Sequence, residues 1–224
     1  MRRLFILRPE PGAAATVESA REMGLDAIRM PLFALEPVEW AAPDASGFDG
    51  LLLTSANAVR HAARQLDKLR GLPVHAVGEA TAETARAAGL DIASVGTVGV
   101  EQLLGSIDGN LRLLHLCGEH RIAVATRQAI TALPVYRSAA LPPPAGLAQI
   151  GRQAVAVHSP RAGSRLAELV DAAGIARSSI RIAAISPAAA AAAGSGWEAC
   201  EAAETPDDGA LLALAARLCD CCRR

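Results

Sequence analysis

The sequence contains few aromatic side chains, a single lysine and no long apolar segment. Phe, Trp and Tyr make up 3% of the 224 residues, with Tyr136 as the sole tyrosine and Lys68 as the sole lysine. Schiff-base chemistry would therefore have to use Lys68, which lies in a polar helical pattern typical of a protein surface. No apolar run approaches the roughly 20 residues that a membrane helix needs. We therefore expect no membrane partner.

An excess of charge of one sign is also missing. The chain has 22 basic and 23 acidic residues, a net charge of -1, and no block of like charge. Proteins that bind nucleic acids normally present a basic face, so no nucleic-acid partner is expected. The segment 1–9 is too short for a signal-peptide core, and the five cysteines are odd in number. These features predict a cytoplasmic protein without structural disulfides, in which Cys219–Cys222 form a frayed tail.

What the sequence does contain is an internal repeat. Residues 54–58 (TSANA) end one apolar run, and residues 158–162 (HSPRA) end another, 104 positions later. Residues 78–82 (GEATA) correspond to residues 186–190 (SPAAA) at a shift of 108, and the same shift relates Leu103 to Leu211 and Leu104 to Leu212. Two half-chains with the same order of strand, polar turn and helix predict two similar α/β lobes with a cleft between them.

Apolar runs of strand length alternate with helical patterns along nearly the whole chain, which favours parallel sheets. Strands are expected at 4–7, 27–35, 48–54, 74–77, 92–95, 111–117, 134–141, 154–158, 181–185 and 200–203. Helices are expected at 13–23, 57–69, 81–88, 100–107, 121–131, 146–152, 163–173, 188–193 and 207–218.

Two connections rich in proline divide the chain. Pro37 and Pro43 punctuate one connection, and residues 142–144 are three consecutive prolines. A lobe that the chain enters once and leaves once accounts for this pattern. We therefore expect a discontinuous lobe one at 1–35 and 142–224, an inserted lobe two at 44–132, and connector segments at 36–43 and 133–141.

The turns after the expected strands are rich in helix-capping residues. Thr54, Ser55 and Asn57 follow one strand, Gly78 and Thr81 follow the next, and the pairs 159–160 and 186–187 each place a serine before a proline. Each residue alone is explained by capping. As a set on both walls of a cleft, free N–H groups at helix starts make receptors for carboxylates or phosphates.

Other motifs carry less weight. His115, Cys117 and His120 have a spacing open to metal binding, but they straddle a strand end and lack a fourth ligand, so no metal is expected. No glycine-rich dinucleotide fingerprint, Walker loop or nucleophile elbow is present. His158 and Ser159 are neighbours that point to opposite faces of a strand. No acid is placed in the sequence to orient the histidine, which argues against a nucleophile pair.

Several of these residues together resemble a known family. Arg8-Pro9 after the first strand, residues 53–59 (LTSANAV) and residues 77–82 (VGEATA) are similar to uroporphyrinogen-III synthases. So are residues 135–137 (VYR), residues 158–160 (HSP) and the terminal helix at Leu211-Leu212. The resemblance runs through the whole chain in order. It implies two flavodoxin-like lobes joined by a two-stranded connector, with no cofactor and no metal.

The family's reaction closes the linear tetrapyrrole hydroxymethylbilane into uroporphyrinogen III, with loss of water and inversion of ring D. The resemblance implies that Tyr136 donates a proton to the departing hydroxyl, although a structural tyrosine in the connector explains it equally well. The substrate, a polycarboxylate, would lie in the cleft and would be bound by a further set of residues: Arg8, Thr54, Ser55, Asn57, Gly78, Thr81, Ser159, Arg161 and Ser186.

The sequence departs from the family in two places. Ser186 and Ala189 stand where the family usually has glycine and threonine, and the stretch between Gly118 and Tyr136 is short. A rival hypothesis is a two-lobed protein that binds a small anion and catalyses nothing. A turnover assay separates the two functions. The sequence calls for no oligomeric partner, and we expect a monomer.

Overall fold

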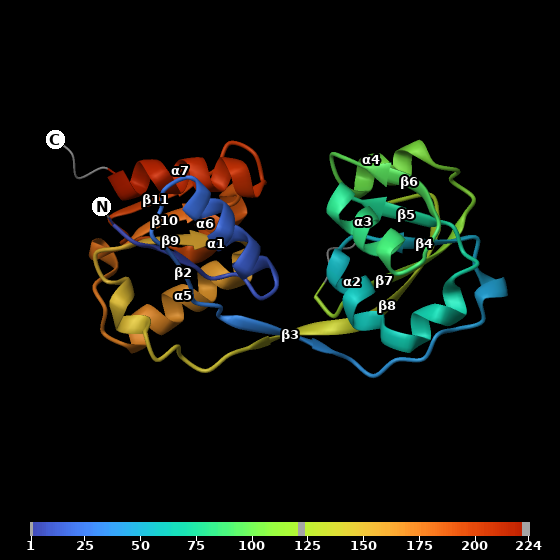
Figure 1. Cartoon of the computed structure of the whole chain (residues 1–224), viewed down its shortest axis with the longest axis horizontal. Coiled ribbons are helices and arrows are strands. Elements are labelled where there is room, and N and C mark those ends of the chain that lie inside the picture. Colours follow the sequence, from blue (N-terminus) through green and yellow to red (C-terminus); the bar gives the residue numbers. More distant parts are fainter. Residues whose placement is uncertain (1, 121–123, 221–224) are drawn as a thin grey trace. The chain divides into compact units, whose positions relative to one another are not determined.

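A computed structural model of the chain describes residues 2–120 and 124–220. The chain divides into two compact units, of which unit 1 comprises Met1–Ala34 and Ala139–Arg224, and unit 2 comprises Leu35–Ser138 (Figure 1). The strands form two sheets, of five and six strands, and apart from β3 with β8 the neighbouring strands within them are parallel. The expected α/β class with two mainly parallel sheets is confirmed.

The sheet of unit 1 has the strand order β11-β10-β9-β1-β2. Its strands are β1 (Leu4–Ile6), β2 (Ala27–Arg29), β9 (Ala154–Val157), β10 (Arg181–Ala184) and β11 (Ala199–Ala202). Helices α1 (Gly12–Glu22) and α7 (Asp208–Asp220) pack on one face, and α5 (Pro160–Ala172) and α6 (Pro187–Ala193) pack on the other.

Burial on both faces explains the apolar run that forms β1. Leu4 and Ile6 join the core under α1 and α7, whereas Phe5 and Leu7 join the core under α5 and α6. Each of these four side chains is at most 1% exposed. When successive side chains of a strand are buried in two different cores, every position of the strand is hydrophobic.

The sheet of unit 2 has the order β3-β8-β7-β4-β5-β6. Its strands are β3 (Phe33–Pro37), β4 (Gly50–Leu53), β5 (Val74–Val77), β6 (Ile92–Gly96), β7 (Arg112–Gly118) and β8 (Ala129–Ala140). Its helices are α2 (Ala56–Ala62), α3 (Glu79–Ala87) and α4 (Val100–Ser106). Short 3-10 helices occur at Ala45–Gly47, Ala63–Leu69, Leu147–Ile150 and Arg177–Ser179.

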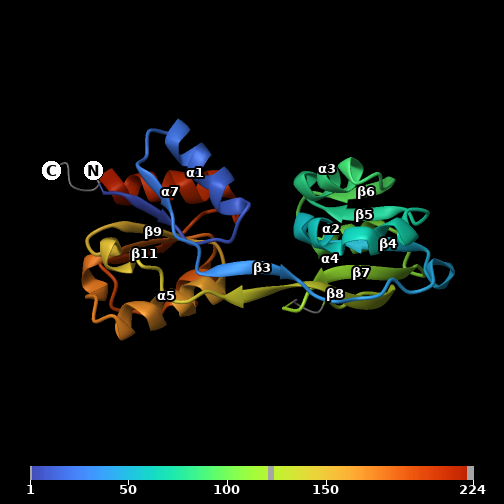
Figure 2. The same cartoon turned by 60° about the horizontal axis from the view of Figure 1, so that its bottom comes forward.

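Strands β3 and β8 carry the chain across the boundaries between the units at Ala34 and Ser138. Backbone hydrogen bonds join Val38 N to Val135 O at 3.1 Å and Leu141 N to Leu32 O at 2.9 Å. The residue numbers rise on one strand as they fall on the other, so this pair is antiparallel. Figure 1 and Figure 2 show the two strands side by side.

The two sheets share one order of strands. Reading β11-β10-β9-β1-β2 against β6-β5-β4-β7-β8 matches each strand of unit 1 with a strand of unit 2. The residues of the sequence repeat occupy matching places, since Thr54 follows β4 and His158 follows β9. Helix α7 of unit 1 likewise matches α4 of unit 2, because each follows the strand at the same edge.

Several local expectations are wrong. The strand expected at 27–35 is divided into β2 and β3, which belong to different sheets. The segment 124–128 is not helical, and residues 129–131 begin β8, because pairing of β8 with β7 outweighs local helical propensity. The helix expected at 146–152 is a 3-10 helix at Leu147–Ile150. Cys219 lies in α7 with no exposed surface, because that face of the helix packs on the sheet. Residues 121–123, 221 and 222 lie outside the described part of the chain.

One close contact between helices shapes unit 1. A Cβ atom added at Gly163 of α5 would lie 2.7 Å from Ala189 O and 3.0 Å from Ala193 N of α6. A glycine at this position allows the two helix backbones to approach each other closely. Among the described residues, no helix has the length and apolar character needed to cross a membrane.

Candidate active site in unit 2

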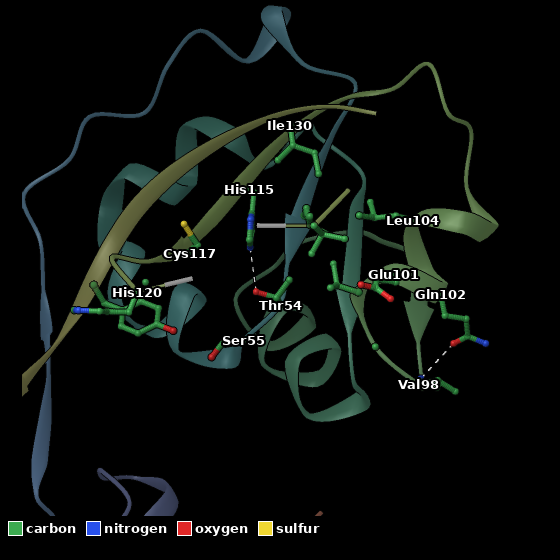
Figure 3. A pocket seen from close by; sticks show the side chains of 16 residues that line it. Thr54, Ser55, Val98, Glu101, Gln102, Leu104, His115, Cys117, His120 and Ile130 are labelled. Atoms are coloured by element: carbon green, nitrogen blue, oxygen red, sulfur yellow. Dashed lines mark hydrogen bonds between the residues drawn. The ribbon is translucent and has the colours of Figure 1, made fainter. Parts of the chain in front are cut away.

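A pocket of about 730 Å³ lies within unit 2. Its polar wall is formed by the turns that follow β4 and β7, and its apolar wall includes Leu52, Leu104 and Ile130 (Figure 3). The start of α4 closes another side through residues 98–102. The pocket therefore sits at the carboxyl ends of parallel strands, where ligands of open α/β sheets bind.

Thr54 and His115 form a hydrogen-bonded pair in this pocket. Thr54 Oγ1 lies 3.0 Å from His115 Nε2 (Figure 3), and His115 is 7% exposed. Strand pairing brings them together, because β4 and β7 are neighbours in parallel register with Leu53 opposite Leu116. Ser55 also lines the pocket, and its hydroxyl accepts a hydrogen bond of 3.2 Å from Asn57 N.

Tyr136 lines the same pocket from β8. It lies opposite Gly118 of β7, and a Cβ atom at Gly118 would be 2.9 Å from Tyr136 Cζ and 3.1 Å from its hydroxyl oxygen. The ring of His61 stacks on the tyrosine, with centroids 5.7 Å apart. Burial lowers the pKa of His61, and the charge of Arg60 lowers it further. A neutral imidazole therefore supports the phenol ring near neutral pH.

The pocket brings together three of the predicted site residues, namely Thr54, Ser55 and Tyr136. The other three in unit 2 are not among its lining residues. Asn57 Oδ1 accepts a hydrogen bond from Arg60, and Gly78 precedes α3 with a φ of 82°, which favours glycine. Thr81 is 6% exposed, and its backbone N–H donates to Gly78 O.

The predicted residues of unit 1 make local contacts. Ser159 and Ser186 cap α5 and α6, where their hydroxyls accept hydrogen bonds of 3.2 Å from Ala162 N and 3.3 Å from Ala189 N. The guanidinium of Arg161 lies over the ring of Phe33, 4.7 Å from its centroid. These contacts neither require nor exclude a ligand, so the assignment of these residues to substrate binding stays a prediction.

Arg8, the remaining predicted residue, is part of an ionic cluster. Its Nη1 atom donates to both carboxylate oxygens of Asp208 at 2.9 and 2.8 Å, and to Thr16 Oγ1 at 3.1 Å. The Thr16 hydroxyl donates to Asp208 at 2.6 Å. His158 Nε2 lies 3.3 Å from Asp208, without the alignment of a hydrogen bond. The expectation that no acid lies against His158 is therefore wrong, because tertiary packing of α7 brings Asp208 to it.

The cluster changes the pKa of Asp208. Burial alone would raise this pKa, but contacts with His158 and Thr16 and the charge of Arg8 outweigh burial and lower it to about 2. Asp208 is therefore a carboxylate at neutral pH. Arg8 already has a counter-ion within its own unit, which the sequence did not indicate.

The two units differ at matching places. In unit 1 the ends of β1 and β9 and the start of α7 carry Arg8, His158 and Asp208, and the first two both contact Asp208. In unit 2 the ends of β7 and β4 and the start of α4 line the open pocket. An internal ionic cluster thus occupies in one unit the place that is hollow in the other.

Among the described residues, the pocket's lining includes no arginine or lysine, and its titratable side chains are Glu101, His115, Cys117, His120 and Tyr136. Within residues 2–120 and 124–220, no group of three or more His, Cys, Asp or Glu side chains could hold a metal ion. A carboxylate in this pocket would therefore rely on hydroxyl, imidazole and backbone donors.

Sequence reasoning missed three residues of the two clusters. His115 entered only as a metal-ligand candidate, although an apolar strand interrupted by one histidine is a signal for a buried polar contact. Gly118 was treated only as the end of a segment. Asp208 was not singled out as a site residue, and its partners Arg8 and His158 are too distant in sequence for the contacts to be inferred.

Comparison with known proteins identifies the family. The family model described as uroporphyrinogen-III synthase HemD matches residues 14–213. A curated uroporphyrinogen-III synthase from Chlorobaculum parvum is 31% identical over 101 residues, an alignment that covers 41% of this chain and 41% of that relative.

Solved structures show the same fold. Uroporphyrinogen-III synthetase from Helicobacter pylori has a TM-score of 0.69 at 16% identity, covering 97% of this chain and 100% of that one. A mutant uroporphyrinogen III synthase from Thermus thermophilus has a TM-score of 0.56 at 20% identity, covering 97% of this chain and 98% of that one. Since the family model spans most of the sequence, the chain belongs to the uroporphyrinogen-III synthase family.

Proposed function

We propose that this chain cyclises hydroxymethylbilane to uroporphyrinogen III, with loss of water and inversion of ring D. The observation that carries the proposal is that the pocket of unit 2 gathers Tyr136, Thr54 and Ser55 in a chain of this family. A proton donor and neutral hydrogen-bond donors thus lie at one place.

The proposed reaction needs only one side chain as a proton donor. Tyr136 donates its proton as the C–O bond of the hydroxymethyl group breaks, so that water leaves and an electron-rich pyrrole is left as an azafulvene-like cation. The substituted carbon of ring D attacks this cation through a spiro intermediate. Attack at the free carbon instead gives the type I isomer. Product identity therefore depends on how the substrate is held.

Binding of the substrate's carboxylate arms is the second part of the proposal. Hydroxyls and helix-start N–H groups serve as receptors, which suits a pocket whose described lining residues include no arginine or lysine. Besides Thr54 and Ser55, the residues assigned to binding are Arg8, Asn57, Gly78, Thr81, Ser159, Arg161 and Ser186. Arg8 is the weakest of these, because Asp208 already neutralises it.

The finer architecture belongs to the same proposal. The two units are flavodoxin-like lobes with related strand orders, and β3 and β8 are the two-stranded connector. The reaction needs no added cofactor or metal, because the substrate itself supplies the reactive cation. The cleft between lobes, the monomeric state and the cytoplasmic location stay predictions.

The experiment that tests this function is isomer analysis. The purified chain is incubated with freshly prepared hydroxymethylbilane, without cofactor, and the products are oxidised and separated as type I and type III porphyrins. We expect mainly type III, against type I in a reaction without protein. Type I alone at every protein concentration would contradict the proposal and would favour a protein that binds anions without turnover.

A further inference from the structure

We infer that His115 is a positioning residue, which directs the Thr54 hydroxyl so that it donates a hydrogen bond to a carboxylate of the substrate. The inference rests on the proposed function and concerns the same pocket. It assigns to His115 a task that neither the sequence resemblance nor the comparisons supply.

The argument begins with the hydrogen-bonding capacity of a hydroxyl. Thr54 has one O–H proton and a rotatable bond, so its partner decides where the proton points. Among the described residues, the hydroxyl makes one hydrogen bond, the 3.0 Å contact with His115 Nε2. If Nε2 carries a proton, the threonine oxygen accepts it, and the hydroxyl proton is left for a ligand.

The surroundings of the pair fix its geometry. His115 is 7% exposed within the paired strands β7 and β4, so its ring has little freedom to turn. Both side chains of the pair line the pocket (Figure 3). With its proton on Nε2, the ring is a fixed donor that holds a mobile hydroxyl in one direction.

The hydrogen-bonding groups of the pocket identify the acceptor. Its lining, as far as the structure describes it, holds no arginine or lysine and one acidic side chain, Glu101, so an anionic arm depends on hydrogen bonds from neutral groups and the imidazoles. A hydrogen bond to a charged group is stronger than one between neutral groups. A carboxylate, with two acceptor oxygens and no proton to give, fits a hydroxyl whose oxygen is already occupied.

A second buried pair in the same sheet provides a matched control. His75 Nδ1 lies 2.8 Å from Ser94 Oγ, and His75 is 7% exposed, as His115 is. Neither His75 nor Ser94 is among the pocket's lining residues. Loss of either pair removes a buried histidine–hydroxyl contact, but only the pair in the pocket can alter substrate binding.

The test measures kcat and KM for formation of the type III isomer. The substitutions Thr54→Val and His115→Phe each remove one side of the pair, and each should raise KM about tenfold with kcat within about threefold, as expected for one charge-assisted hydrogen bond. The double variant should be no worse than either single variant, because both lose the same interaction. His75→Phe and Ser94→Ala should leave KM unchanged.

Two amide replacements at His115 distinguish a positioning role of this residue from a purely structural one. In His115→Gln the amide nitrogen reaches the place of Nε2, whereas in His115→Asn it stops near Nδ1. His115→Gln should therefore restore KM to within about threefold of the original protein, and His115→Asn should not. Thermal unfolding of both variants checks that they fold alike.

The outcomes are distinct. Equal KM values for the two amide variants, additive effects in the double variant, or the same KM increase for His75→Phe would each overturn the role of His115 while leaving the enzyme function intact. If the unmodified chain forms no type III isomer, the proposed function itself fails. Because the variants are compared with an active parent, the two failures are separate.

Discussion

A single guanidinium nitrogen of Arg8 contacts both carboxylate oxygens of Asp208, 200 residues further along the chain. The pair links the end of β1 to the start of α7, so it joins the two sequence segments that make up unit 1. Both side chains are about a third exposed, at 33% and 37%. The pair is therefore a moderate stabilising contact of the fold. The guanidinium of Arg8, which could otherwise bind an anionic ligand, is already paired with Asp208.

Asp208→Asn should lower the free energy of unfolding by about 1 kcal/mol, after allowance for solvent screening of a partly exposed pair. Urea unfolding at neutral pH measures the change. Asp26→Asn is the control, because its ion pair with Arg3 is more exposed, at 57% and 54%, and should contribute less. An equal loss in both variants would mean that the cluster around Asp208 adds nothing beyond a surface ion pair.

The same pair predicts a dependence of stability on pH. The pKa of Asp208 is lowered from 3.8 to about 2, so the folded protein binds a proton there less readily than the unfolded chain. Its contribution is fully present above the unfolded pKa and is lost as pH falls from 4 towards 2. The stability difference between the original chain and Asp208→Asn should shrink over that range, as acid titration of urea unfolding would reveal.

Tyr136→Phe should lower kcat about 100-fold or more, which is the usual contribution of a positioned proton donor. The unfolding temperature should change little, because Phe retains the ring that stacks on His61. Stopped assays of type III formation, together with thermal unfolding, separate these effects. An unchanged kcat would remove Tyr136 from the proton transfer and leave positioning by the pocket as the main contributor.

Gly118→Ala should also lower kcat, without removing the phenol. The added Cβ would lie 2.9 Å from Tyr136 Cζ, so the ring has to move. The effect should be about tenfold or more, since small misplacements of a catalytic group are costly. Gly71→Ala is the control, because a Cβ there meets nothing within 4 Å. In a Tyr136→Phe background, Gly118→Ala should add little, and a full additional loss would point to another role for the glycine.

Gly163→Ala should destabilise unit 1 by about 1–3 kcal/mol, the usual cost of overpacking. Its Cβ would meet the backbone of α6 at Ala189 O, which cannot rotate away as a side chain can. Denaturant unfolding measures the loss, and Gly71→Ala again serves as the neutral comparison. A stability within about 0.5 kcal/mol of the parent would mean that α5 and α6 separate freely.

The sequence was sufficient to predict the strands that are buried on both faces, because their apolar runs have no other explanation. The run at 48–54 corresponds to β4 at Gly50–Leu53, and Ser159 and Ser186 were recognised before the helices that they cap. Local patterns failed at 124–131, where pairing with β7 draws residues 129–131 into a strand. Helical propensity cannot report the presence of a neighbouring strand.

The candidate site was predictable only in part. Thr54, Ser55 and Tyr136 were each identified from sequence, and the pocket brings them together. The contact partners of two predicted residues were not identified, because His115 contacts Thr54 across 61 positions and Asp208 contacts Arg8 across 200 positions. Such contacts follow from the order of strands in the sheet, which no local pattern contains.

The ionic cluster in unit 1 has a consequence for how the protein responds to small acids. Because Asp208 belongs to the same chain as Arg8, it binds Arg8 at a high effective concentration. A carboxylic acid in solution can hardly displace it. Acetate or propionate in a buffer should therefore leave the ion pair of Arg8 intact. Inhibition by small acids should arise instead at hydroxyl and backbone donors that no carboxylate of the chain already occupies.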